Sequence, residues 1–128
     1  MASIYHLVPA GYYESQPENQ PYLPATFAEE KFIHCTAGVA LLLEIANTYF
    51  DTLSEPLLVL EIIPKQVTAP IKFEKPIPPA GQAATDKSTD VNGQDILFPH
   101  IYGPLNRDAI STCFALHRDK AGHWQMPE

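Results

Sequence analysis

Three histidines and one tyrosine lie in apolar segments that contain few charges. His6 lies in IYHLV, His34 in KFIHCT, and His100 with Tyr102 in FPHIYG. Imidazole titrates near neutral pH and also binds metals, so histidines gathered in one cleft could perform acid–base chemistry or hold a ligand. Residues two apart in an extended segment point the same way, so His100 and Tyr102 are expected to share a side. Prolines on both sides restrict the backbone around this pair.

Glu61 is a further candidate because it interrupts the apolar run LLVLEII. A carboxylate in such a strand requires a partner or a polar cleft, since an isolated buried charge is unfavourable. We therefore predict one polar cleft in an apolar scaffold, which is the usual anatomy of a small-ligand pocket. Its expected walls are the segments that carry His6, His34, Glu61, and His100 with Tyr102.

Two alternatives compete with a ligand pocket. The histidines could bind zinc or another transition metal, although the chain has no H-x-H, H-E-x-x-H or C-x-x-C spacing. Cys35 could be a nucleophile, but it is adjacent to His34 and neighbouring strand residues face opposite ways. His117 and His123 flank the charged turn RDKAG, which indicates exposed positions outside any site.

The composition limits the class of protein. The 128 residues suit a single domain over residues 1–128, and 45% hydrophobic content is typical of a globular chain. A net charge of −7, from 15 acidic and 8 basic residues, argues against an extended nucleic-acid surface but permits a single nucleotide. Cys35 and Cys113 form no disulfide framework, and the longest apolar run is too short to span a membrane. A cytoplasmic protein is expected.

The pattern of apolar residues predicts an α+β fold in which strands outnumber helices. Residues 38–50 have the only long stretch of helical spacing, with Thr36 as a candidate N-cap, and TFAEE matches a capping box from Thr26 to Glu29. Residues 76–94 are rich in proline and small polar residues and are expected to form a long flexible loop. Strands or extended segments are expected at 3–8, 31–36, 57–63, 71–75, 96–102, 110–117 and 123–126, and short helices at 10–15 and 106–109.

Three motifs in this order, IYHLVPAGYY, LPATFAEEKFIHCT and FPHIYGPLNRDAI, are typical of one protein family. Over residues 4–119 the chain closely resembles the bacterial domain-of-unknown-function 952 family, which has no established activity. Lys31 departs from the family pattern, which usually has a glycine before FIHC. The loop at 76–94 is also longer than is typical.

That family is distantly similar to proteins with the ADP-ribosyltransferase-like fold, in which a split, mostly antiparallel sheet binds NAD. The resemblance implies a histidine-lined pocket for NAD or a related nucleotide, and an ADP-ribosyl or phosphoribosyl transferase or hydrolase activity. It implies cofactor contacts from His6, Tyr102 and Thr36, and catalytic roles for His34 and His100. Glu61 is added as a catalytic candidate from its place in the apolar run. The third-motif carboxylate of that fold is absent from FPHIY. A non-catalytic nucleotide- or anion-binding domain and a histidine-dependent metalloenzyme remain the alternatives.

Overall fold

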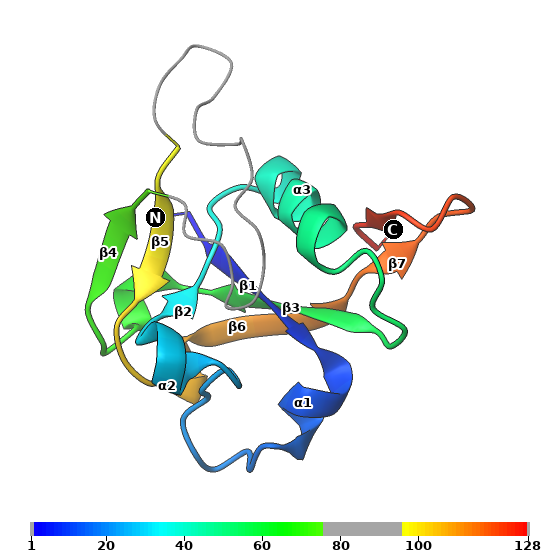
Figure 1. Ribbon diagram of the computed structural model, residues 1–128. Helices are drawn as coiled ribbons and strands as arrows, with labels where there is room; N and C mark the ends of the chain where they lie inside the picture. Colours follow the sequence, from blue (N-terminus) through cyan, green and yellow to red (C-terminus); the bar gives the residue numbers. More distant parts are fainter. Residues whose placement is uncertain (1, 76–95, 128) are drawn as a thin grey trace.

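The computed structural model describes residues 2–75 and 96–127, and the predicted loop at 76–94 lies outside them. The fold is α+β, with antiparallel sheets and few helices (Figure 1). The helices, including two short 3-10 helices, are α1 (Ala10–Ser15), α2 (Phe27–Glu30), α3 (Val39–Tyr49), η1 (Pro64–Gln66) and η2 (Arg107–Ala109). The strands are β1 (Ile4–Pro9), β2 (Ile33–His34), β3 (Leu57–Ile62), β4 (Ile71–Glu74), β5 (Phe98–Ile101), β6 (Ile110–Ala115), β7 (His117–Arg118) and β8 (Trp124–Gln125).

The first sheet has the strand order β1-β3-β6. Strand β3 lies in the middle, which agrees with the nearly continuous apolar run that predicted a central strand. In β1 the buried positions alternate, so that Ile4, His6 and Val8 face one side. Those residues lie over the core between the two sheets, to which Leu60 and Ile62 of β3 also contribute.

The second sheet has the order β2-β5-β4, and the chain after β2 joins it to the first sheet. Pro99 lies in the central strand β5, where a residue without an N–H interrupts the ladder. The Pro99 carbonyl still accepts the N–H of Cys35 at 3.0 Å. The segment after β2 then turns away from β5, and Thr36 pairs with Tyr5 of β1. Pro99 thus marks the place where the two sheets separate.

Helix α3 covers the other side of the first sheet (Figure 1). Its buried residues Leu42 and Ala46 pack with Leu57 and Val59 of β3, as the helical spacing predicted. The helix begins after Gly38, which has a φ of 102° and is its N-cap. The prediction that Thr36 caps this helix was therefore wrong.

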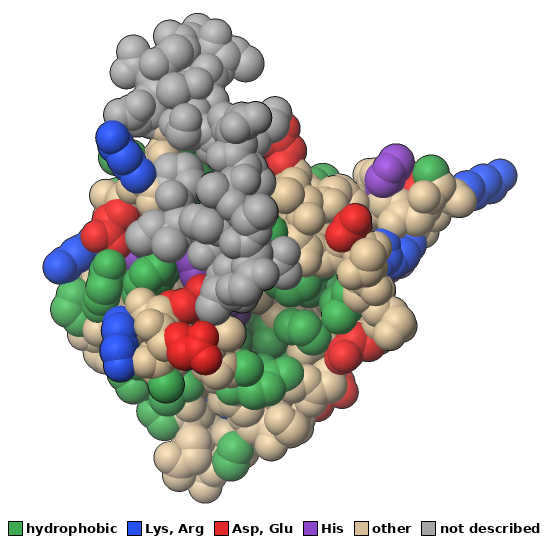
Figure 2. Space-filling view, viewed as in Figure 1, with side chains coloured by type: hydrophobic (Ala, Val, Ile, Leu, Met, Phe, Trp, Pro, Cys, Tyr) green, Lys and Arg blue, Asp and Glu red, His purple; other side chains and the backbone are tan. Residues whose placement is uncertain are grey.

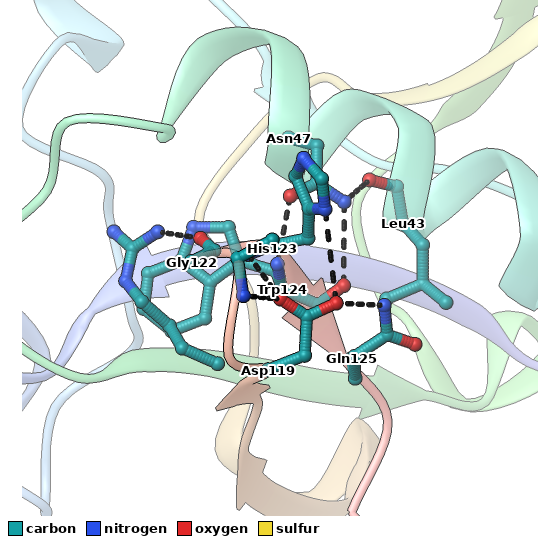
Figure 3. A network of polar contacts seen from close by, with 9 residues as sticks. Leu43, Asn47, Asp119, Gly122, His123, Trp124 and Gln125 are labelled. Carbon is teal, nitrogen blue, oxygen red and sulfur yellow. Dashed lines mark hydrogen bonds and ion pairs between the residues drawn. The ribbon is translucent and has the colours of Figure 1, made fainter.

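The β7–β8 hairpin holds the C-terminal end of α3 through polar contacts (Figure 3). Asn47 accepts the backbone N–H of Trp124 at 2.7 Å, and the Trp124 indole N–H donates to the carbonyl of Phe50 at 2.9 Å. Arg118 lies over the Trp124 ring, with its guanidinium carbon 3.8 Å from the ring centroid, and donates to the carbonyl of Leu53 at 2.6 Å. Carbonyls at the end of the helix are thus satisfied by the hairpin.

Helix α2 is a single turn that ends at Lys31. Lys31 has a left-handed φ of 71°, a conformation in which glycine is favoured because it lacks a Cβ. The capping box was predicted wrongly, because the Thr26 hydroxyl caps no backbone N–H and donates instead to the carboxylate of Glu30. Among residues 2–75 and 96–127, no helix is long and apolar enough to cross a membrane.

Candidate functional site

The side chains of His34 and His100 meet where β2 pairs with β5. The two residues are direct neighbours in the antiparallel ladder, and their ring centroids are 5.6 Å apart in an edge-to-face arrangement. Phe32 fills the angle between them: its ring stacks on His100 at 4.2 Å and is tilted against His34 at 4.7 Å. Tyr102 adds a fourth ring, 5.4 Å from that of Phe32. We call these four residues the aromatic cluster.

Each imidazole of the aromatic cluster is bound to a different carboxylate. His34 Nε2 lies 2.7 Å from Glu30 Oε2, and His100 Nδ1 lies 2.8 Å from Glu74 Oε1. Glu30 comes from α2, four residues before His34, whereas Glu74 comes from β4, the strand next to β5. Histidine and acidic side chains lie next to one another on the face that Figure 2 shows. Two histidine–carboxylate pairs thus lie side by side, joined by Phe32.

Glu74 accepts two hydrogen bonds on one oxygen. The Tyr102 hydroxyl donates to Oε1 at 2.5 Å, next to the contact of the same atom with His100. These two bonds lower the pKa of the Glu74 carboxyl, and the bond from Tyr102 raises the pKa of the Tyr102 hydroxyl. Glu74 is therefore ionised at neutral pH, with about a third of its side chain exposed (34%).

His100 is neutral at physiological pH. Its side chain is only 1% exposed, and this burial lowers its pKa, although the bond to Glu74 acts in the opposite direction. Because ionised Glu74 can only accept, Nδ1 of His100 carries the proton and Nε2 carries the lone pair. His100 therefore has the protonation state of a base or a hydrogen-bond acceptor at Nε2.

Lys72 brings a positive charge to the same side of β4. It pairs with His100 in the β4–β5 ladder, and its ammonium lies 4.9 Å from the centroid of the Tyr102 ring. Its charge also contributes to the lowered pKa of Glu74. The site thus presents the anion Glu74 and the cation Lys72 next to the aromatic rings of Tyr102 and Phe32.

His6 contacts the backbone of His34 and is enclosed by the core between the sheets. The His6 ring is buried, and Nδ1 donates to the backbone carbonyl of His34 at 2.6 Å while Nε2 accepts the Tyr22 hydroxyl at 2.8 Å. Burial lowers the pKa of His6 to about 4. Both ring nitrogens are thus occupied by protein atoms.

Thr36 and Glu61 lie on either side of Tyr5, Thr36 in an isolated bridge after β2 and Glu61 in β3. Glu61 accepts the hydroxyl of Ser3 at 2.9 Å, and Thr36 is buried. Neither residue has a described contact with the aromatic cluster. The structure therefore brings together His34, His100 and Tyr102 of the predicted site residues. Glu61 and Thr36 pair with Tyr5 instead. The expectation that His6 lines the same cleft was wrong, because its buried ring is bonded to Tyr22 and to the backbone of His34.

Comparison with known proteins gives the family of the chain. The profile of a family described as "Protein of unknown function (DUF952)" matches residues 7–113. The chain belongs to the DUF952 family. No curated protein matches this DUF952 chain.

A solved structure with the same fold is that of protein CC0527 from Caulobacter crescentus, a structural-genomics target. It is 21% identical to this DUF952 protein, with a TM-score of 0.71, over 97% of this chain and 94% of the other. A double mutant of CC0527 matches over the same shares of both chains, again at 21% identity, with a TM-score of 0.65. These similarities show the fold alone.

Four residues of the site in this DUF952 protein were missed by the sequence reasoning: Glu30, Phe32, Lys72 and Glu74. Glu30 had a usable signal, because it precedes His34 by four residues across a helix end. Glu74 reaches His100 only through the pairing of β4 with β5, which residue spacing does not reveal. Among the residues that the structure describes, no three His, Cys, Asp or Glu side chains are arranged to hold a metal ion.

Proposed function

We propose that the aromatic cluster binds NAD or a related nucleotide and that the protein is a cytoplasmic ADP-ribosyl transferase or hydrolase with an ADP-ribosyltransferase-like fold. The observation that carries the proposal is the convergence of His34, His100 and Tyr102 on two carboxylates. The third motif lacks the carboxylate of that fold, and Glu74 supplies one from the adjacent strand, 2.8 Å from His100 and 2.5 Å from Tyr102.

The chemistry of nicotinamide–ribose cleavage suits such a carboxylate. The bond breaks through a cationic, sugar-like transition state, which a fixed negative charge stabilises. Glu74 is ionised and is held by two donors, so it needs no reorganisation when positive charge develops. His100, with its lone pair at Nε2, could accept a proton from a ribose hydroxyl or from the attacking water. Lys72 and the exposed part of His34 could contact the phosphates.

Burial and stacking of the cluster favour one geometry for these groups. Phe32 contacts the other three rings, and it is buried itself. The imidazoles are therefore held by packing on one side and by carboxylates on the other, as a preorganised site requires. A non-catalytic nucleotide-binding domain would use the same contacts, so turnover has to be measured directly.

Binding is tested first, by the melting temperature of the protein with NAD, ADP-ribose or zinc. A ligand that binds only the folded state raises the melting temperature, and we expect this for NAD and ADP-ribose. His34→Ala should abolish the increase, whereas His117→Ala, which removes an exposed histidine outside the cluster, should retain it. No increase with either nucleotide at millimolar concentration would refute the proposal, and an increase with zinc alone would favour a metalloenzyme.

Turnover is tested by nicotinamide release. We expect release by the wild-type protein and a loss of about 100-fold or more in Glu74→Gln, because the variant keeps the shape of the side chain and removes its charge. NAD binding by Glu74→Gln should persist, which separates catalysis from binding. If the wild type binds NAD and releases no nicotinamide, the protein is a binding domain.

A further inference from the structure

Strand β6 is an edge strand in the part of the chain that the structure describes. It pairs with β3 on one side, and no other described strand follows it in the β1-β3-β6 order (Figure 1). Natural edge strands are commonly protected by lysine, proline or inward-pointing charges. The β6 sequence ISTCFA has none of these, and Ser111, Thr112 and Cys113 are exposed. A bulge at Ser111 disturbs only the beginning of the strand.

Among the described residues, the backbone of the second half of β6 is paired on one side only. The N–H of Leu116 donates to the carbonyl of Leu57 at 2.9 Å. Backbone N–H and C=O groups point to alternate sides along a strand, so those of Phe114 and Thr112 also point toward β3. The N–H and C=O groups of Cys113 and Ala115 therefore point away from β3. These two residues offer the pattern that an added antiparallel strand requires.

A groove of about 460 Å³ runs along this edge. One wall is β6 from Ile110 to Cys113, and the other is formed by Tyr13 and Glu14 of α1 with the following loop. Cys113 and Leu60 are ladder neighbours, and Leu60 faces the core between the sheets, so the groove lies on the α1 side of the first sheet. The side chains of an added strand would project toward this groove at every second residue.

The charged side chains along the groove indicate the charge of a partner that would bind there. Glu14 and Glu18 both line it and both are exposed. The single cation there, Arg107 among the described residues, is already held by the Tyr13 hydroxyl at 3.0 Å and by two backbone carbonyls. A second copy of this chain, with a net charge of −7, would bring its own acidic residues against the same wall. The groove therefore favours a cationic partner.

We propose that β6 docks an extended basic peptide segment, which adds to the first sheet as a fourth strand. The backbone of Cys113 and Ala115 supplies the ladder hydrogen bonds. Lysine or arginine at alternate positions of the peptide faces Glu14 and Glu18. This surface is formed by residues other than those of the aromatic cluster and does not depend on the nucleotide reaction proposed above.

The probe is a short labelled peptide that alternates lysine and threonine, added to the full chain. Two peptides serve as controls: one with glutamate in place of lysine, and one with N-methyl groups on the residues that would donate to β6. We expect binding of the lysine peptide alone, measured by fluorescence anisotropy. We also expect slower amide hydrogen exchange at Cys113 and Ala115 and no change at Thr112 and Phe114, which already face β3.

Variants test the charge selection. Glu14→Gln and Glu18→Gln together should weaken binding by roughly two- to tenfold, as expected for two exposed ion pairs. Glu29→Gln changes an exposed glutamate outside the groove and should have no effect. Absence of binding at millimolar peptide would overturn the proposal. Equal binding of the N-methylated peptide would also overturn it, because attraction without strand addition would then explain the affinity.

Discussion

The buried His6 predicts a specific loss of stability in mild acid. In the folded protein its pKa is about 4, lowered mainly by burial, whereas an exposed histidine titrates near 6.5. Below pH 6.5 the unfolded chain therefore takes up a proton at His6 that the folded protein does not. Stability falls as the pH falls through this window and levels off for this group below about pH 4.

The magnitude follows from the distance between the two pKa values. One pH unit between them corresponds to about 1.4 kcal/mol, so lowering the pH from 7 to 5 should reduce the free energy of unfolding by about 2 kcal/mol. The groups around the ring are Tyr22, the backbone and side chain of His34, and Glu30. Glu30 favours the protonated form and the charge of the His34 ring opposes it, and both effects are smaller than that of burial.

Urea unfolding of the wild type and of His6→Gln at pH 7, 6 and 5 isolates this effect. Glutamine fills part of the space and cannot be protonated, so the carboxylates common to both proteins cancel in the difference. We expect the stability advantage of the wild type to shrink by about 2 kcal/mol between pH 7 and 5. His117→Gln, at an exposed position, should follow the wild type.

One result would refute this reasoning. If the difference between wild type and His6→Gln is the same at pH 7 and pH 5, His6 takes up its proton in the folded state as readily as in the unfolded one. An NMR titration in which the His6 ring is protonated above pH 5.5 would lead to the same conclusion. The ring would then be accessible to solvent or ligand, contrary to its contacts with Tyr22 and the His34 carbonyl.

Three further predictions concern single residues. Lys31→Gly should stabilise the protein by about 0.5–1 kcal/mol in urea unfolding, because position 31 has a left-handed φ of 71°; no gain would show that Lys31 makes a compensating contact. Leu60→Ala should destabilise it by about 2–5 kcal/mol, since the side chain is fully buried between the sheets, and a loss below about 1 kcal/mol would contradict that packing. Glu74→Gln should lower the pKa of His100 further, measured by NMR, because the carboxylate favours the protonated ring; an unchanged pKa would mean that the 2.8 Å contact does not form in solution.

The local elements could be predicted because their signals lie in short stretches of sequence. The helix expected at 38–50 occurs as Val39–Tyr49, and the helix at 10–15 occurs as Ala10–Ser15. Strand β3 is central, as its apolar run indicated. The capping box failed because Thr26 had a competing partner in Glu30, which a motif search does not weigh.

The site was predicted less completely because it depends on pairing between distant strands. Of the three histidines expected in one cleft, His34 and His100 are ladder neighbours. The occupation of both His6 ring nitrogens depends on Tyr22 and the His34 carbonyl, which come from distant segments that residue spacing does not bring together. The left-handed backbone at Lys31 is a conformation that favours glycine, which agrees with the glycine expected there from the resemblance to the family.

The β7–β8 hairpin that contacts the end of α3 also affects the order in which the elements fold. The carbonyl of Phe50 is capped by the indole of Trp124, and Asn47 is bonded to the same residue, 77 positions away in the chain. During synthesis α3 would leave the ribosome long before these partners exist, and its last turn would remain frayed. We expect the last turn of α3 to become stable only when β8 docks, so that docking of β8 is a late step in folding.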